Sequence, residues 1–342
     1  MKTKAKRNEQ DMQYLENTLM GREMIGKTDG TVTVRPLGHN EAVTTSADIM
    51  TEGVELTREL TIIDKVVADA IYTLHEQHKD VFSLNQICEI LTGGNWSTPG
   101  MREIVQNSIK KMMLTRVRID CTAEICKREN KPTAGRKVVY EGYLLPLETV
   151  YETFGNRESV TYRMMKTPPL LEYAKRIRQV IAYDPALLQI GEKNNTADIL
   201  AIRYILLSKI MMLSNGKGRA KSTLTMDELQ KLLNMNPKDR RKRMKIADAV
   251  ETILQAYCET PNTPVYGWDV ITGPRGSWQG VSIGVMPRTV ANQTMMEAEP
   301  EQMRQDKDDD ILTFWETDEM LDWWATQGMA KIARGHTKQM RS

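Results

Sequence analysis

The densest cluster of charge in the sequence follows Pro237, where six of the next eight residues are lysine or arginine. Apolar residues at helical spacing come next, which predicts one helix with Ile246 and Val250 on its core face. A rotation of 100° per residue then divides the cations among the helix faces. The outward positions are Lys238, Arg241 and Lys245, the flanking positions are Arg240 and Lys242, and Arg243 lies nearer the core.

Lysine and arginine on one helix face can donate hydrogen bonds to phosphate oxygens and to guanine edges in the major groove of DNA. The first turn of a helix ordinarily favours acidic residues, because its free N–H groups carry partial positive charge. A row of lysine and arginine residues at that position therefore indicates an anionic ligand. A solvated helix face is the alternative interpretation, since an exposed charge run needs no ligand.

Two further basic segments are candidates for contact with a phosphate backbone. Lys217, Arg219 and Lys221 lie in a loop with two glycines, which is equally consistent with an ordinary exposed loop. Arg275 lies in a Gly-Pro-Arg-Gly turn at the tip of an expected hairpin. An arginine at such a tip can contact an adjacent backbone or minor groove.

The residues that would catalyse a reaction or hold a metal do not form a working pattern. The segment 21–28 matches the phosphate-loop motif, but it lacks the preceding buried strand and the following helix. His75 and His78 share a helix face without a third ligand at metal spacing. We therefore expect no enzyme, no metal and no cofactor. ATP hydrolysis that is lost in Lys27→Ala would contradict this expectation.

The elements that would position the cations occur in an order that is repeated. An amphipathic helix over 60–78 is followed by a capping box at Ser83–Gln86, which begins a second helix. Pro99 begins a third helix, because proline at the first helical position loses no hydrogen bond. Alternating apolar residues over 117–121 and 138–144 then predict a hairpin.

The same order returns after residue 196. An apolar helix covers 197–213, and Thr225–Glu228 is a second capping box. Asn236 and Pro237 are expected to begin the basic helix, and 268–271 with 278–285 predict a second hairpin. Helix, helix, helix, hairpin is the order of a winged-helix domain, whose third helix enters the major groove.

The first repeat has a weaker case for contact with DNA. The cations of its third helix are spread out and interrupted by Glu103. Its hairpin loop is basic and is a candidate for phosphate contact, with association or positioning as the alternative role. The cations of the helix are Arg102, Lys110 and Lys111, and those of the loop are Lys127, Arg128, Lys131, Arg136 and Lys137.

Composition favours an intracellular protein without a membrane span. The 342 residues carry 47 Lys+Arg and 45 Asp+Glu, so affinity for nucleic acid must come from local clustering. The four cysteines form no disulfide-rich pattern, and no signal peptide or long apolar run is present, so we expect a soluble cytoplasmic protein.

The predicted fold class is α+β, mainly α with small β-hairpins, built as two tandem winged-helix domains. A flexible N-terminal arm and an acidic C-terminal tail are expected to flank them. The predicted boundaries are 1–55 for the arm, 56–150 for the first winged-helix domain, 151–195 for a helical connector, 196–288 for the second winged-helix domain, and 289–342 for an acidic spacer with a terminal amphipathic helix.

Residues 55–287 resemble the plasmid replication initiators that bind repeated origin sequences through two winged-helix domains. The resemblance is carried by local sequence and by the order of elements, and the arm and the tail depart from it. The segments are Leu60-Thr-Ile-Ile-Asp-Lys-Val-Val67, Pro168-Pro-Leu-Leu-Glu-Tyr173, Ile202-Arg-Tyr-Ile-Leu-Leu207, and Asn236-Pro237 with its basic run.

The resemblance implies a replication initiator of a plasmid or phage that binds double-stranded DNA at repeated origin sites and helps to open the duplex. It assigns base contacts to Lys238, Arg241 and Lys245, and association as a homodimer to the first domain. Host helicase or initiator proteins would be partners, with the tryptophan-bearing tail as a candidate docking peptide or a helix that packs on its own core. The alternative is a winged-helix transcriptional regulator or autorepressor, because one fold serves both functions.

Overall fold

A computed structural model describes most of the chain up to residue 286. The described ranges are 12–27, 29–35, 43–51, 59–93, 99–154, 157–191, 196–215, 222–236, 238–261 and 263–286. The predicted acidic spacer and terminal helix at 289–342 lie outside these ranges, as do Lys217, Arg219, Lys221 and Pro237. Within them, no helix has the length and apolar character needed to cross a membrane.

Six elements form the first repeat, and local capping begins two of its helices. Thr61 and Asp64 form a capping box at the first helix, and Ser83 and Gln86 form the predicted one at the second. The second helix ends at Gly93 in the left-handed conformation, which glycine adopts without strain. The elements are α2 (Ile62–Glu76), β4 (Val81–Ser83), α3 (Leu84–Thr92), α4 (Pro99–Met113), β7 (Leu147–Phe154) and β8 (Arg157–Met164), with sheet order β4-β8-β7.

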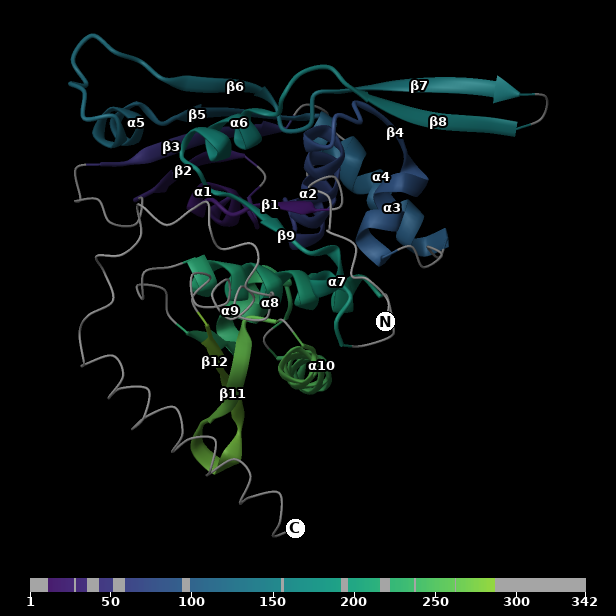
Figure 1. The fold of residues 1–342 in the computed structure, drawn as a ribbon, viewed down its shortest axis with the longest axis vertical. Helices are drawn as coiled ribbons and strands as arrows, with labels where there is room; N and C mark the ends of the chain where they lie inside the picture. Colours follow the sequence, from purple (N-terminus) through teal and green to yellow (C-terminus); the bar gives the residue numbers. More distant parts are fainter. Residues whose placement is uncertain are drawn as a thin grey trace, which may run out of the picture. The chain divides into compact units, whose positions relative to one another are not determined.

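The second repeat has the same order of helices and strands. The predicted capping box of Thr225 and Glu228 begins its second helix, and its hairpin lies beside its third helix (Figure 1). The elements are α8 (Ala197–Asn215), β10 (Thr223–Thr225), α9 (Met226–Leu232), α10 (Arg240–Glu259), β11 (Val265–Thr272) and β12 (Trp278–Val285), with sheet order β10-β12-β11. The two repeats thus share one arrangement of three helices and a three-stranded antiparallel sheet.

The hairpin of the first repeat lies later in the chain than predicted. Strands 115–120 and 139–143 do pair, but as β5 and β6 of a separate four-stranded sheet. Its order is β2-β3-β5-β6, with β2 at Gly30–Val34 and β3 at Thr45–Thr51. The strand that docks on β4 is β8, and β7 and β8 form a long hairpin (Figure 1). The prediction had placed 147–150 in the first domain and 151–164 in the connector, and it missed the pairing of β7 with β8.

The predicted N-terminal arm also contains regular structure. Leu15 and Met20 are fully buried, and this burial offsets the polar composition that suggested a mobile segment. The elements here are β1 (Gln13–Glu16), α1 (Leu19–Glu23), β2 (Gly30–Val34) and β3 (Thr45–Thr51), of which β2 and β3 join β5 (Thr115–Asp120) and β6 (Val139–Tyr143).

The segment predicted as a helical connector is mixed. After β8 it contains α6 (Pro169–Arg176), β9 (Val180–Tyr183) and α7 (Pro185–Leu188), and β9 pairs antiparallel with β1. Between β5 and β6 lies α5 (Thr122–Arg128). The α+β class is confirmed, but strands make up more of the fold than the predicted small hairpins.

Candidate nucleic-acid interface

The basic helix begins later than the sequence suggested. Asp239 is its N-cap, with Oδ1 accepting a hydrogen bond of 3.0 Å from the backbone N–H of Lys242. Asn236, the predicted cap, instead accepts from the N–H of Lys238 at 3.0 Å. Lys238 therefore lies in the turn before α10, and the helix itself starts at Arg240.

The cations at this end lie largely on the surface, in keeping with the predicted helix faces. Lys238, Arg241 and Lys245 are exposed, and so is Arg240, which the rotation had placed on a flank. Lys242 and Arg243 are half-buried. The opposite face packs into the core through Ile246, Ala249, Val250, Ile253, Leu254 and Tyr257.

Among the residues that the structure describes, these exposed cations have no carboxylate partner. Lys242 lies 3.5 Å from Asp198, whereas Lys238, Arg240, Arg241 and Lys245 have no ion pair with any residue that the structure describes. The first turn of α10 contains no acidic residue. The start of the helix is thus a positive surface that can accept an anion without first breaking an internal pair.

An apolar side chain lies among these cations, and charge patterning alone had not singled it out. Met244 is 58% exposed on the same side of α10 as Arg240, Arg241 and Lys245. Residues at 240, 241, 244, 245 and 248 share one helix face, so helical periodicity was the signal that could have identified it.

The hairpin of the second repeat is fixed to the basic helix. The indole Nε1–H of Trp278 in β12 donates to Oε1 of Glu251 in α10 at 2.9 Å. At the tip, Pro274–Gly276 forms a single 3₁₀ turn in which exposed Arg275 has φ +60°. The strands therefore hold Arg275 at the outer end of the hairpin, as predicted from the turn sequence.

The basic residues of the first repeat and its neighbouring sheet are mostly engaged internally. Lys111 forms an ion pair with buried Asp64, and Arg102 donates to Asn85. Arg128 pairs with Glu124 at 2.9 Å. These residues offer less free positive charge than the start of α10.

Three of the five cations of the predicted phosphate-contacting loop, Arg128, Lys131 and Arg136, form internal ion pairs. Arg136 and Lys131 approach Glu129 at 2.7 and 3.1 Å, and Arg176 pairs with the same carboxylate. Hydrogen bonds from these three cations lower the pKa of Glu129 to about 2. The loop also follows α5 in the four-stranded sheet, so it is not the hairpin tip of the first repeat.

A buried polar cluster lies where β1, α2 and α8 meet. Lys65 Nζ lies 2.5 Å from Oε2 of Glu16 and 3.6 Å from Oδ2 of Asp69. Tyr204 of α8 donates its hydroxyl to Asp69. Burial of the Asp69 carboxylate outweighs the attraction of Lys65 and raises the pKa of Asp69 to about 7.

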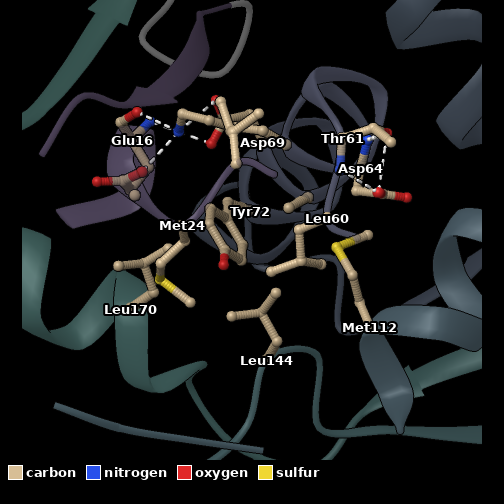
Figure 2. A pocket seen from close by; sticks show the side chains of 14 residues that line it. Glu16, Met24, Leu60, Thr61, Asp64, Asp69, Tyr72, Met112, Leu144 and Leu170 are labelled. Atoms are coloured by element: carbon tan, nitrogen blue, oxygen red, sulfur yellow. Dashed lines mark hydrogen bonds and ion pairs between the residues drawn. The ribbon is translucent and has the colours of Figure 1, made fainter. Parts of the chain in front are cut away.

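Next to this cluster is a small, mostly apolar cavity (Figure 2). Tyr72 points its hydroxyl into it toward Leu144, and that oxygen is fully buried with no hydrogen-bond partner among the described residues. Desolvation raises the pKa of Tyr72 well above its ordinary value. The hydroxyl is therefore protonated at neutral pH and is a donor, not a base.

The phosphate-loop motif has no phosphate-binding geometry. Gly21 lies inside α1, where its N–H donates to Thr18 Oγ1 at 2.9 Å. The carboxylate of Glu16 packs against Gly21, which would repel an anion. Thr28, the hydroxyl position of the motif, lies outside the described residues.

Two further candidates for chemistry, Cys121 and His75, are packed or paired. Burial raises the pKa of the Cys121 thiol to about 12, which opposes formation of a nucleophilic thiolate. His75 is hydrogen-bonded through Nδ1 to Asp80 at 2.7 Å. Over the described ranges, no group of three or more His, Cys, Asp or Glu side chains is arranged to hold a metal ion.

Comparison with known proteins gives little beyond a weak structural likeness. No protein-family model and no curated protein matches the chain. Two solved structures of domains 2 and 3 of RctB are similar to it, one at 15% identity over 77% of this chain and 92% of the other. The second is 12% identical over 78% and 94%. Both have a TM-score of 0.42, so they carry no argument about function.

Proposed function

We propose that this protein binds double-stranded DNA through two tandem winged-helix domains and acts as a replication initiator. The observation that carries the proposal is the cationic start of α10, the third helix of the second repeat. Four exposed cations there have no carboxylate partner among the described residues. In a winged helix, this is the end of the helix that enters the major groove.

The other parts of the second repeat support the same docking. Arg275 at the hairpin tip is in the position from which a wing contacts the backbone beside the groove. The Trp278–Glu251 hydrogen bond keeps this hairpin in a fixed relation to α10. We also propose that the loop with Lys217, Arg219 and Lys221, which precedes the second helix of this repeat, contacts phosphates.

We assign a different role to the first repeat. Several cations of this repeat and of the neighbouring four-stranded sheet are neutralised by carboxylates, so their electrostatic contribution to DNA binding is small. We propose that it serves association, as a homodimer, or places the second repeat on its site. No catalysis or cofactor is needed for this function, and host replication proteins would supply the enzymatic steps.

The binding proposal is tested with single substitutions in α10 and in the turn before it, and with a matched control. Arg241→Ala and Lys238→Ala should each reduce discrimination between specific and random duplex by about 1–3 kcal/mol if they contact bases. Substitution of a residue that contacts only phosphate should instead reduce the slope of log K against the logarithm of the salt concentration by roughly 0.9 per lost contact. Lys131→Ala removes the same charge from an exposed but paired lysine and should change neither quantity.

The affinities are measured by fluorescence anisotropy over a series of salt concentrations. If Arg241→Ala and Lys238→Ala bind specific and random duplexes as the wild type does, α10 does not lie in the groove and the proposal is wrong.

A transcriptional regulator on the same scaffold is separated from an initiator by the DNA beside the gene. Directly repeated protein-binding sites next to an AT-rich segment favour an initiator, whereas a single palindrome favours a repressor. Footprinting of the flanking DNA with the purified protein distinguishes the two arrangements.

A further inference from the structure

One side chain on the proposed DNA-contacting face of α10 cannot bind phosphate. Met244 is 58% exposed, although the residues around it on this face, Arg240, Arg241, Lys245 and Asp248, are all charged and exposed. Among the residues of α10, it is the one large apolar side chain with this exposure. Lysine and glutamate have a similar helix propensity, so helix formation does not account for a methionine at this position.

Its position is that of a base-contacting residue. With Asp239 as N-cap, Met244 lies in the second turn of α10, one turn after Arg240 and Arg241. The first turns of a recognition helix approach the base edges. Arg240, Arg241 and Lys245 on this face supply cations for phosphates and guanines, which leaves an apolar contact for Met244.

The major groove offers one apolar group to such a side chain, the C5-methyl group of thymine. Methionine is long and flexible, so it can reach and cover a methyl group without a fixed geometry. A protein partner would need a contiguous apolar patch on this face. The charged residues that surround Met244 favour DNA over a protein surface.

We propose that Met244 packs against the C5-methyl group of a thymine and thereby requires a T·A pair at one position of the bound site. This inference rests on the proposed DNA-binding function and adds a specificity-determining residue to it. The thymine lies beside the base pairs contacted by the arginines one turn earlier in the helix.

The test removes the methyl group from the DNA and the thioether from the protein, separately and together. A specific duplex is first selected by the wild-type protein from a random library. Each thymine is then replaced singly with deoxyuridine, which keeps the hydrogen bonds of the base pair and lacks only the methyl group. Affinities of wild type, Met244→Ala and the control Met165→Ala are measured on every duplex.

We expect one thymine at which the wild type loses about fourfold in affinity with deoxyuridine, the value for one buried methyl group. Met244→Ala should bind the two duplexes equally at that position and respond as the wild type does at the others. Met165→Ala, which removes a 60% exposed methionine outside α10, should match the wild type throughout.

The outcomes distinguish this inference from the function on which it rests. If the wild type selects no specific duplex, the DNA-binding function itself is wrong. If it selects one but no deoxyuridine weakens binding, or if Met244→Ala keeps the wild-type loss at every position, Met244 contacts no thymine methyl and only this inference is overturned.

Discussion

The buried carboxyl of Asp69 should make the stability of the protein depend on pH. Its pKa is raised from 3.8 to about 7 in the folded protein. Between these values, the folded state keeps a proton that the unfolded chain releases, so the free energy of unfolding falls as pH rises from about 4 through about 7. Each pKa unit corresponds to 1.36 kcal/mol, and the total loss is therefore roughly 4 kcal/mol.

Burial and the neighbouring groups together set the raised pKa of Asp69. Lys65 lies 3.6 Å away and lowers the pKa of Asp69, while the nearby carboxylate of Glu16 raises it. The backbone N–H of Glu16 donates to Oδ1 at 3.1 Å, and Tyr204 donates to Oδ2. Burial is the largest contribution, because α2, β1 and α8 exclude water from the carboxyl.

Asp69→Asn should abolish this component of the pH dependence, since the amide keeps the shape of the side chain but does not titrate. The free energy of unfolding is measured by urea denaturation with circular dichroism between pH 5 and pH 8. We expect the wild-type curve to fall relative to that of Asp69→Asn as pH rises. Asp269→Asn, a substitution of an exposed aspartate in β11, should run parallel to the wild type.

Tyr204→Phe provides a second perturbation of the same carboxyl. The hydroxyl of Tyr204 lowers the pKa of Asp69 by donating to it, so its removal should move the wild-type transition to higher pH. Parallel curves for wild type and Asp69→Asn, or an unshifted transition in Tyr204→Phe, would refute the account of this cluster.

Three further predictions concern stability. Asp64→Asn leaves Lys111 without its buried counter-ion and should cost about 3–5 kcal/mol in urea denaturation. Gly280→Ala should cost at least about 2 kcal/mol in the same assay, because φ is +153° and the added Cβ would meet the carbonyl oxygen of Leu224. Glu129→Gln should remove the loss of stability that the wild type shows as pH falls from about 4.5 toward 2, because the pKa of Glu129 is lowered to about 2. This last prediction is checked by comparing the melting temperatures of Glu129→Gln and wild type between pH 2 and pH 6.

The features predicted correctly from the sequence are those determined by contacts between residues close together in the chain. The capping boxes at Ser83 and Thr225 were predicted correctly, because a cap joins residues three positions apart. The core face of α10 followed from helical periodicity in the same way. The start of α10 was misplaced by three residues because Asn236 and Asp239 both have cap chemistry, and it is Asp239 that accepts from the N–H of Lys242 in the first turn of the helix.

Contacts between distant segments account for the errors. The hairpin of the first repeat is β7–β8 because Phe82 of the three-residue strand β4 pairs with Tyr162 of β8, eighty positions later. The N-terminal segment folds because β1 pairs with β9, which places Leu15 opposite Ile181. Neither of these strand pairings can be predicted from composition or short-range periodicity. The exposure of Met244 could likewise not be predicted from its own helix, because it depends on whether a segment distant in the sequence covers that face of α10.

The start of α10 differs from the first repeat and its neighbouring four-stranded sheet in what surrounds the cations, and this difference bears on function more than the order of elements that the two repeats share. A nearby carboxylate must be displaced or left unpaired before a lysine or arginine can bind phosphate, which reduces the net gain from that contact. Lys131, Arg136 and Arg128 carry that cost, whereas Arg240 and Arg241 do not. Because the net charge of the whole chain is only +2, its long-range attraction to a polyanion is weak, and the proposed docking on DNA therefore depends on the local surface at the start of α10.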